Sequence, residues 1–328
     1  MNLQTIRRLV GGMMLALAPA LALTTFAAEH ATTTPTADRT LAGDAACTRC
    51  HDQSESKPVL AIYKTRHGVK ADSRTPGCQS CHGASVAHIR NEADQDPRPP
   101  TDIAFGAGAT ANLDQQVQTC VACHKGGQRG HWDGSAHQGA GVACTSCHVV
   151  HTQHDKVLSK ATQSEACFAC HKSERAQMHR VSTHPLAAGK MGCSDCHNPH
   201  GSTGPKLMRK GSVNETCTSC HAEKRGPFLW EHEPVTEACT TCHTPHGSNA
   251  TPLLKVRTPM LCQACHSGDH GAQINSAANL QKGDITTARG ALPLAGAAAR
   301  AQLGGRNCQA CHFQTHGSNH PAGAKLLR

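Results

Sequence analysis

Aromatic side chains are scarce in this chain of 328 residues, which has two tryptophans, one tyrosine and five phenylalanines, or 2% aromatic residues. The length is sufficient for two ordinary domains, yet large apolar side chains normally dominate the energetics of a domain core. The scarcity therefore argues against an ordinary hydrophobic core. The buried apolar surface of the folded protein has to come from another source.

Features of several common protein classes are also missing. The sequence has no glycine-rich nucleotide-binding loop and no group of residues typical of nucleophilic catalysis. After residue 28, no apolar run is long enough to span a bilayer. Methionine is rare, and Met178, Met191, Met208 and Met260 recur at no repeated position. These absences exclude nucleotide chemistry and disfavour methionine as a recurring ligand.

Cysteine, in contrast, follows one pattern throughout. The pentapeptide C-x-x-C-H occurs ten times, and the ten motifs use all twenty cysteines. This motif is the attachment signature of c-type haem, in which two thiols bind the porphyrin covalently and the histidine ligates the iron. The ten sets are Cys47/Cys50/His51, Cys78/Cys81/His82, Cys120/Cys123/His124, Cys144/Cys147/His148, Cys167/Cys170/His171, Cys193/Cys196/His197, Cys217/Cys220/His221, Cys239/Cys242/His243, Cys262/Cys265/His266 and Cys308/Cys311/His312.

Other interpretations of the cysteines fail on this regularity. A single C-x-x-C could be a redox pair or half of a zinc site. Neither a zinc site nor a disulfide framework has a reason to place a histidine after every second cysteine. We therefore expect ten covalently bound haem c groups, whose macrocycles supply the missing core.

The formal charge of +9 would favour nucleic acid or an anionic membrane as a partner. Ten haems, however, bring about −20 from their propionates and about +10 from ferric iron, so the oxidised holoprotein is near −1. The cofactors' own charge removes the argument for a nucleic-acid partner. We expect the basic residues to offset propionates.

Residues 1–28 have the form of a secretory signal peptide. Arg7 and Arg8 form a positive start, residues 9–23 are apolar, and small residues follow for cleavage. An uncleaved anchor is the alternative, but the apolar run is short and contains Pro19. Residues 29–43 are rich in Thr, Ala and Pro and are expected to be a mobile leader. The sequence therefore predicts an exported protein.

Residues 44–328 are predicted to be one decahaem domain built of five two-haem units. In each unit one histidine precedes the second motif and another follows it. Local texts also recur, as in residues 198–202 (NPHGS) and 244–248 (TPHGS). The histidines at these repeated positions are His67, His88, His137, His151, His184, His200, His232, His246, His270 and His316.

The histidine count agrees with one sixth ligand per haem. Of 25 histidines, ten belong to the motifs and His30 lies in the leader, which leaves fourteen. The repeat selects ten of these fourteen, so every iron is expected to have two histidine ligands. His320 competes with His316 in the stretched fifth unit. The sequence does not say which of these histidines serves which haem. The other histidines, His131, His154 and His179, are assigned with His320 to surface or propionate contacts.

Two stretches interrupt the repeat, residues 91–118 and 272–305, which are rich in Ala, Gly, Pro and polar residues. We expect both to be loops, either passive or used for docking to a partner. The predicted fold class is a multihaem cytochrome c. It is an elongated wire of stacked haems, mostly coil with short α-helices and little or no β-sheet.

Saturated irons favour an electron conductor over an enzyme. A multihaem nitrite or hydroxylamine enzyme needs an open iron position, which its family signals by a Lys in one motif or by a missing sixth ligand. Here all ten motifs end in His. The chain is therefore expected to carry electrons and not to be an enzyme. Within that class, a fixed wire and a freely diffusing periplasmic carrier both remain open.

The sequence resembles the MtrA-type, or DmsE-type, periplasmic decahaem cytochromes of outer-membrane porin–cytochrome conduits. The resemblance covers about residues 44–328. The stretches that carry it are residues 193–202 (CSDCHNPHGS), 220–227 (CHAEKRGP), 229–232 (LWEH) and 316–321 (HGSNHP). It implies a haem wire inside an outer-membrane β-barrel porin, at the periplasmic side of the outer membrane.

The same resemblance implies the partners. These are the porin, periplasmic or inner-membrane cytochromes, and an extracellular multihaem cytochrome or terminal reductase. It further implies transfer of electrons to or from extracellular iron or a similar partner, without fixing the direction. The two interrupting stretches depart most from the family pattern, so the resemblance assigns no contact to them.

Overall fold

The computed structural model describes residues 43–55, 58–69, 71–106, 109, 111–266, 283–287, 290–294 and 308–327. The chain divides into two compact units, Met1–Asp38 and Arg39–Arg328, and all described residues belong to the second. The predicted signal peptide, and the predicted leader apart from residue 43, lie outside them.

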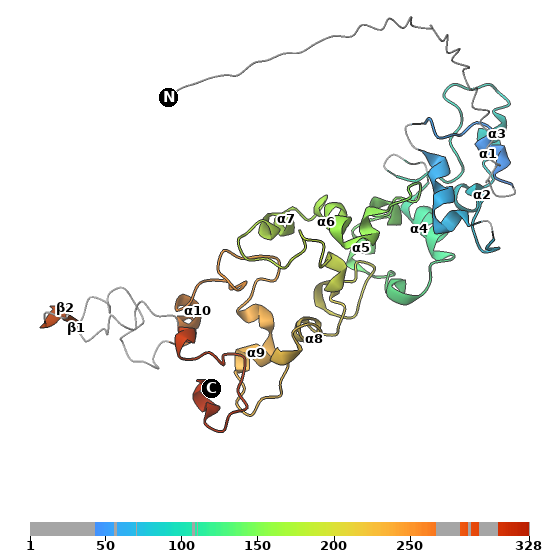
Figure 1. Cartoon of the computed structure of the whole chain (residues 1–328). Helices are drawn as coiled ribbons and strands as arrows, with labels where there is room; N and C mark the ends of the chain where they lie inside the picture. The colour runs from blue at the N-terminus through green and yellow to red at the C-terminus, as the bar shows by residue number, and fades with distance from the viewer. Residues whose placement is uncertain are drawn as a thin grey trace, which may run out of the picture. The chain divides into compact units, whose positions relative to one another are not determined.

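Short helices separated by irregular chain make up most of the second unit (Figure 1). The longest helices in the described part have nine residues. The prediction of a mostly coiled chain with short helices is confirmed. The helices are α1 (Ala45–Thr48), α2 (Cys78–His82), α3 (Val86–Arg90), α4 (Leu113–Val121), α5 (Ala136–Gly139), α6 (Lys160–Phe168), α7 (Lys172–Met178), α8 (Val213–Thr218), α9 (Glu233–Glu237) and α10 (Met260–Gln263).

Short 3-10 helices of three or six residues supplement them. They lie at Val59–Lys64, Arg66–Gly68, Gly127–Arg129, Cys144–Ser146, Lys156–Leu158, Cys193–Asp195, Pro205–Leu207, Ala222–Lys224, Cys239–Thr241, Cys308–Ala310 and Gly323–Lys325. None of the helices in the described ranges is long and apolar enough to cross a membrane.

The two interrupting stretches are not wholly irregular, which corrects the prediction of loops. Residues 91–118 end inside α4, whose start is fixed by a capping box. The Asn112 side chain accepts the Gln115 N–H at 2.8 Å, and the Gln115 side chain accepts the Asn112 N–H at 3.2 Å. This Asn-x-x-Gln signal was present in the sequence.

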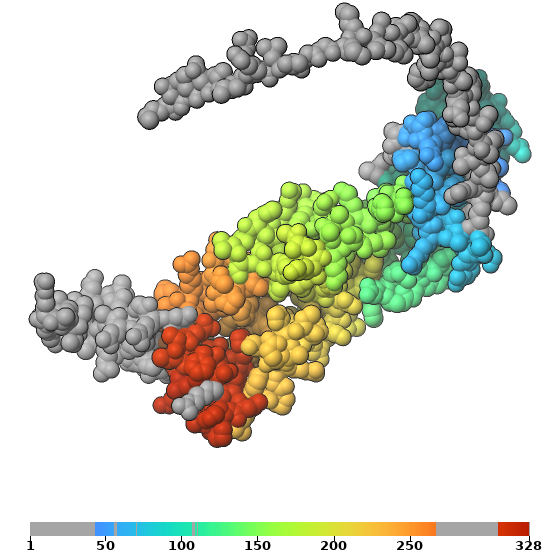
Figure 2. Space-filling model, viewed as in Figure 1, coloured from blue at the N-terminus to red at the C-terminus, as the bar shows by residue number. Residues whose placement is uncertain are grey.

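Residues 272–305 contain the antiparallel hairpin of β1 (Gly283–Thr287) and β2 (Gly290–Leu294), with Gly283 opposite Leu294 and Thr287 opposite Gly290. Within the described residues these are the named strands, so the expectation of little β-sheet holds. The remaining pairings are isolated bridges. Trp230 and Ser318, for example, exchange two backbone hydrogen bonds of 2.8 and 2.9 Å. This bridge brings the gold and red segments of Figures 1 and 2 together.

The protein atoms alone provide very little core. The buried apolar residues of the described part are Ala111, Val117, Trp132, Ala143, Ala250 and Leu254, and no large side chain there is completely enclosed. This agrees with the shortage of aromatics in the sequence. The apolar surface that would normally fill a core has to be supplied by bound groups.

Candidate haem centres

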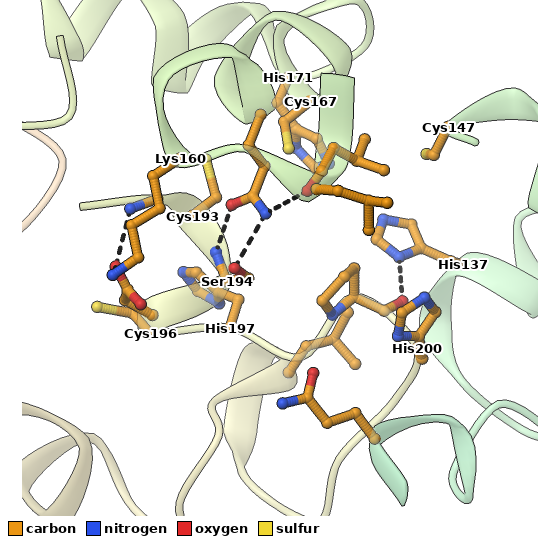
Figure 3. A pocket seen from close by; sticks show the side chains of 18 of the residues that line it. His137, Cys147, Lys160, Cys167, His171, Cys193, Ser194, Cys196, His197 and His200 are labelled. Atoms are coloured by element: carbon orange, nitrogen blue, oxygen red, sulfur yellow. Dashed lines mark hydrogen bonds and ion pairs between the residues drawn. The ribbon is translucent and has the colours of Figure 1, made fainter. Parts of the chain in front are cut away.

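A continuous cavity of about 4290 Å³ runs past the motifs, and residues from all ten motifs line it. A pocket for a single small ligand has roughly 300–1,000 Å³, so this cavity is suited to a row of large groups. Figure 3 shows a part of it, where Cys147, Cys167, Cys193 and Cys196 lie around the same space as His137, His171, His197 and His200. None of the twenty cysteines, all of which are described, forms a disulfide.

One predicted attachment residue, Cys170, differs from the other cysteines in its relation to the cavity. Of the twenty cysteines, all within the described residues, nineteen line the cavity and Cys170 does not. It lies in the short turn between α6 and α7, where its side chain is exposed to solvent. The other two members of its motif, Cys167 and His171, do line the cavity. Attachment at Cys170, like attachment at the other nineteen cysteines, stays a prediction from the sequence.

One local turn shapes each motif. The N–H of the motif histidine donates to the carbonyl of the first cysteine, as in His221 to Cys217 and His266 to Cys262, both at 2.9 Å. A spacing of four residues with this hydrogen bond puts both side chains on the same face of the turn. The C-x-x-C-H pattern therefore folds locally into a site that presents sulfur and imidazole to one ligand.

The motif histidines face the histidines that the repeat selected. Nine pairs have ring centres 5.9–6.4 Å apart. The pairs, motif histidine first, are His51–His88, His82–His151, His124–His67, His148–His200, His171–His137, His197–His246, His221–His184, His243–His316 and His266–His232. The predicted tenth partner, His270, lies outside the described residues.

This spacing fits an iron between each pair. A metal–imidazole bond is about 2.0 Å long, so two ligands on opposite sides of one metal place their ring centres about 6 Å apart. The competitor His320 is placed differently, because its Nδ1 accepts the Ala322 N–H at 3.1 Å. His316 is the residue that faces His243, at 6.2 Å.

The pairs connect neighbouring units in a regular exchange. His67 of the first unit faces His124, the first motif histidine of the second unit, while His151 of the second unit faces His82 of the first. The same exchange relates units two and three, three and four, and four and five. His51 and His88 pair within the first unit. Two histidine pairs thus connect each unit with the next.

The cysteines show the spatial order of the motifs. Within units the first cysteines are neighbours, and the thiols of Cys167 and Cys193 are close enough to hydrogen-bond. Between units the second cysteines are neighbours: burial, and then the charge of Cys123, raises the pKa of Cys81. The within-unit neighbours are Cys47/Cys78, Cys120/Cys144, Cys167/Cys193, Cys217/Cys239 and Cys262/Cys308, and the between-unit neighbours are Cys81/Cys123, Cys147/Cys170, Cys196/Cys220 and Cys242/Cys265. The five contacts within units and the four contacts between units together link the ten motifs in sequence order.

A polar side chain ahead of the first motif holds the second motif in three units. Asp44 accepts the Cys78 N–H at 2.8 Å, Gln163 accepts the Ser194 N–H at 2.9 Å, and Asn214 accepts the Cys239 N–H at 2.7 Å. Sequence reasoning missed these three residues. The available signal was a polar residue three or four positions before the first cysteine of a unit.

Backbone carbonyls orient several of the paired imidazoles. The Nδ1–H of His137 donates to the Pro199 carbonyl at 2.7 Å, and that of His184 donates to the Pro245 carbonyl at 2.9 Å. Each carbonyl belongs to the residue just before the next unit's paired histidine, His200 or His246 in the sequence. A hydrogen bond at Nδ1 fixes the tautomer and leaves Nε2 for a metal.

A glycine follows these histidines for a steric reason. Gly201 and Gly247 have φ values of +108° and +147°, and a Cβ at either position would collide with the carbonyl of His131 or Gln177, respectively. Only glycine permits this close backbone approach. The glycine of the recurring His-Gly-Ser text is therefore required by packing.

Burial prepares several imidazoles for ligation. It lowers the pKa of His82, His124, His200, His246 and His316 below the ordinary histidine value, because burial disfavours the imidazolium form. Metal binding requires the neutral ring. Burial at these five positions therefore favours the neutral form of the ring, which is the form that ligates.

Motifs, facing imidazoles and an extended cavity together define a multihaem c-type cytochrome. The family model "Doubled CXXCH motif" matches residues 184–226 and 232–271, and "Cytochrome c-type protein NrfB-like" matches residues 78–164. The multiheme cytochrome MtrA of Shewanella baltica is 45% identical over 290 residues, which cover 87% of this chain and 81% of MtrA. The chain belongs to the MtrA family of multihaem cytochromes.

Two shorter relatives match part of the chain. The cytochrome c-type protein NrfB of Haemophilus influenzae is 25% identical over 166 residues, covering 45% of this chain and 73% of that protein. NrfB of Escherichia coli is 29% identical over 139 residues, covering 40% and 67%. These similarities agree with covalently bound haem c and with electron transport as the general function.

Proposed function

We propose that this chain is a ten-haem electron conduit of the outer membrane. It works inside a β-barrel porin and connects periplasmic carriers with extracellular acceptors or donors, such as extracellular iron. The observation that carries the proposal is the facing of two imidazoles at nine motifs. Haem c supplies one-electron chemistry when it is bound.

The proposed ligand set consists of the ten motif histidines and the ten histidines of the repeat, His270 included for the last motif. Two protein ligands per iron leave no position for a substrate, which favours electron transfer over catalysis. The proposed order of the haems is the sequence order of the motifs, because first cysteines and second cysteines alternate as neighbours along the unit. An uninterrupted order suits conduction from one end to the other.

The need for a barrel follows from the polar, irregular polypeptide that surrounds the proposed haems. Irregular backbone such as that between the short helices carries many N–H and C=O groups that cannot face lipid. A large outer-membrane barrel can enclose a plug in its lumen. Ten haems cover about 45 Å of membrane if each advances roughly 4.5 Å. Residues 1–28 are proposed to direct the chain to the periplasm. The mature protein is proposed to consist of the leader, residues 29–43, and the decahaem domain, residues 44–328.

The proposed partners beyond the porin are periplasmic or inner-membrane cytochromes at one end and an extracellular multihaem cytochrome or terminal reductase at the other. The first test is co-purification. The tagged cytochrome is purified from outer membranes after mild detergent extraction, and its partners are identified. We expect a separately encoded β-barrel protein in fixed proportion, and a tagged soluble periplasmic cytochrome serves as the control. Recovery of the cytochrome from the soluble periplasm without any barrel would favour a freely diffusing carrier instead.

The ligand set has a test of its own. His246→Met should raise the potential of one haem, the one attached at Cys193 and Cys196, because methionine ligation favours the ferrous state. The other nine should be nearly unchanged. His154→Met is the matched control, because His154 is an exposed histidine outside the repeat. Equal effects of both variants, or no effect of His246→Met, would contradict the assignment.

A further inference from the structure

The second motif of each unit allows a direct comparison between units. In units three, four and five, the Nδ1–H of the motif histidine donates to a backbone carbonyl. The donor and acceptor pairs are His197 with Lys206 at 3.0 Å, His243 with Pro252 at 3.0 Å, and His312 with Lys325 at 2.7 Å. A neutral acceptor is thus the rule at this position.

Unit two departs from this rule. The Nδ1–H of His148 donates to the Asp155 side chain, and the Nδ1–Oδ2 distance is 2.7 Å. The Asp155 side chain is 12% exposed. Its second oxygen, Oδ1, caps the turn Lys156–Leu158 by accepting the Val157 N–H at 3.4 Å. The carboxylate is therefore held in place next to the imidazole.

The neighbouring lysine does not pair with the Asp155 carboxylate. The adjacent Lys156 makes its ion pair with Glu165, at 2.7 Å, and both side chains are more than half exposed. On the opposite side of the centre, His200 lies parallel to His148, with 10° between the rings. Its Nδ1 is buried without a hydrogen-bond partner in the described part of the chain. The hydrogen bonding of this histidine pair is thus one-sided, with a carboxylate on the motif histidine.

Other carboxylates near motif histidines are weaker candidates. Glu55 accepts from His51 at 2.8 Å, but its side chain is 36% exposed and that of His51 is 38% exposed. Glu174 and Glu223 lie 3.8 Å from the Nδ1 atoms of His171 and His221, which is beyond hydrogen-bond distance. Water screens exposed charges far more than buried ones. Among the described residues, Asp155 combines the shortest distance with the lowest exposure.

We propose that Asp155 is a positioning residue that acts through His148 and makes the haem attached at Cys144 and Cys147 the lowest-potential centre of the array. The proposal rests on the proposed ligand set. A carboxylate that accepts from Nδ1 increases the basicity of a metal-bound imidazole. Its negative charge also favours ferric iron over ferrous iron. The centre consequently gives up its electron first and accepts one last.

The position of this centre has a consequence for conduction. It is the fourth of ten motifs in the sequence-ordered row, so it has motifs on both sides. At partial reduction this centre stays oxidised while its neighbours are reduced. Electrons then equilibrate within the first three centres and within the last six before they pass the fourth.

Asp155→Asn tests the proposal in the purified holocytochrome. Asparagine keeps an oxygen acceptor of the same shape but removes the charge. We expect one of ten components to move upward in a redox titration followed by visible absorption and EPR, with the other nine unchanged. That component should be the lowest one in the unmodified protein. Glu174→Gln is the matched control, because it removes a carboxylate 3.8 Å from a motif histidine and should leave all ten components in place.

His200→Met identifies the centre. The new methionine should replace His200 as the second ligand of the iron bound by His148. One haem should then show a near-infrared methionine–iron band. In the double variant Asp155→Asn/His200→Met, the marked component should move upward from its position in His200→Met. If all ten haems of the fully loaded His200→Met variant keep the low-spin spectra of the unmodified protein, the proposed ligand set fails. If a methionine-ligated haem forms but Asp155→Asn leaves it in place, only the role of Asp155 is overturned.

Asp155→Asn alone decides the matter if the methionine variant does not mature. The parallel rings of His148 and His200 place the affected centre among the less anisotropic low-spin EPR signals. A lowest-potential component that stays in place overturns the proposal, as does an equal shift in Glu174→Gln. Intact mass and a low-spin absorption spectrum establish that each variant is folded and fully loaded.

Discussion

Asn214 offers a quantitative test of how the two motifs of one unit are held together. Its side-chain nitrogen donates to the carbonyls of Val235 and Thr236, each at 3.0 Å, and its oxygen accepts the Cys239 N–H at 2.7 Å. A typical hydrogen bond contributes a net ~1 kcal/mol. Because these groups are only partly buried, we expect Asn214→Ala to cost about 2 kcal/mol locally, which is less than the full sum of the three bonds.

Hydrogen exchange of the native holoprotein measures this cost where it falls. A loss of about 2 kcal/mol corresponds to roughly a 30-fold lower protection factor, since 1.4 kcal/mol is about tenfold. The loss should be confined to the peptide that contains Val235, Thr236 and Cys239. Thr218→Ala is the matched control, because the Thr218 hydroxyl donates to the Asn214 carbonyl within α8, at 2.8 Å. Unchanged hydrogen exchange in Asn214→Ala, or an equal loss of protection in Thr218→Ala, would refute the proposal that Asn214 holds the two motifs together.

Three further outcomes are expected. The intact mass of the mature protein should exceed that of the polypeptide by ten haems. A count of eight or nine would contradict the prediction that all twenty cysteines bind haem. EPR of the oxidised protein should contain at least two highly anisotropic low-spin signals, because the rings of His67 and His124 lie at 87° and those of His137 and His171 at 78°. Perpendicular ligand planes leave the two π-type d orbitals of iron nearly degenerate; a spectrum without such signals would contradict these orientations. His270→Ala should turn one low-spin haem into a high-spin haem, and an unchanged visible spectrum would remove His270 from the ligand set.

The histidines of the centres were accessible from the sequence because their positions recur. Repetition separated His184 or His246 from ordinary surface histidines, and the structure sets each opposite a motif histidine. The pairing itself was not accessible. His151 faces His82 across a sequence separation of 69 residues, and a repeat is equally compatible with pairing inside each unit.

The hydrogen-bond partners of the centres were still harder to predict. Asp155 is one of many acidic residues, and nothing in its sequence position distinguishes it from the exposed Glu165. Its role depends on a local turn that brings a carboxylate where the other units have a carbonyl, which in unit one is that of Ile103, 2.9 Å from the His82 Nδ1. The capping box at Asn112 was readable, in contrast, because the two residues that form it are close in sequence. Local signals were visible, and non-local contacts required the fold.

The exchange of ligands also bears on how the units depend on one another. His67 of the first unit faces His124 of the second, and His232 of the fourth faces His266 of the fifth. If these residues ligate iron, no inner unit completes its own centres. Each inner unit would then depend on both of its neighbours for iron ligands, in addition to the nearest-neighbour packing that stabilises other repeat proteins.

We propose that this cytochrome carries electrons across a membrane only when a barrel surrounds it. Proteoliposomes loaded with a reduced redox dye test it most directly, with an impermeant acceptor outside. We predict that cytochrome and porin reconstituted together oxidise the internal dye, and that vesicles with the cytochrome alone or the porin alone do not. Equal oxidation with the cytochrome alone, or none with the complete complex, would contradict the proposed need for a barrel.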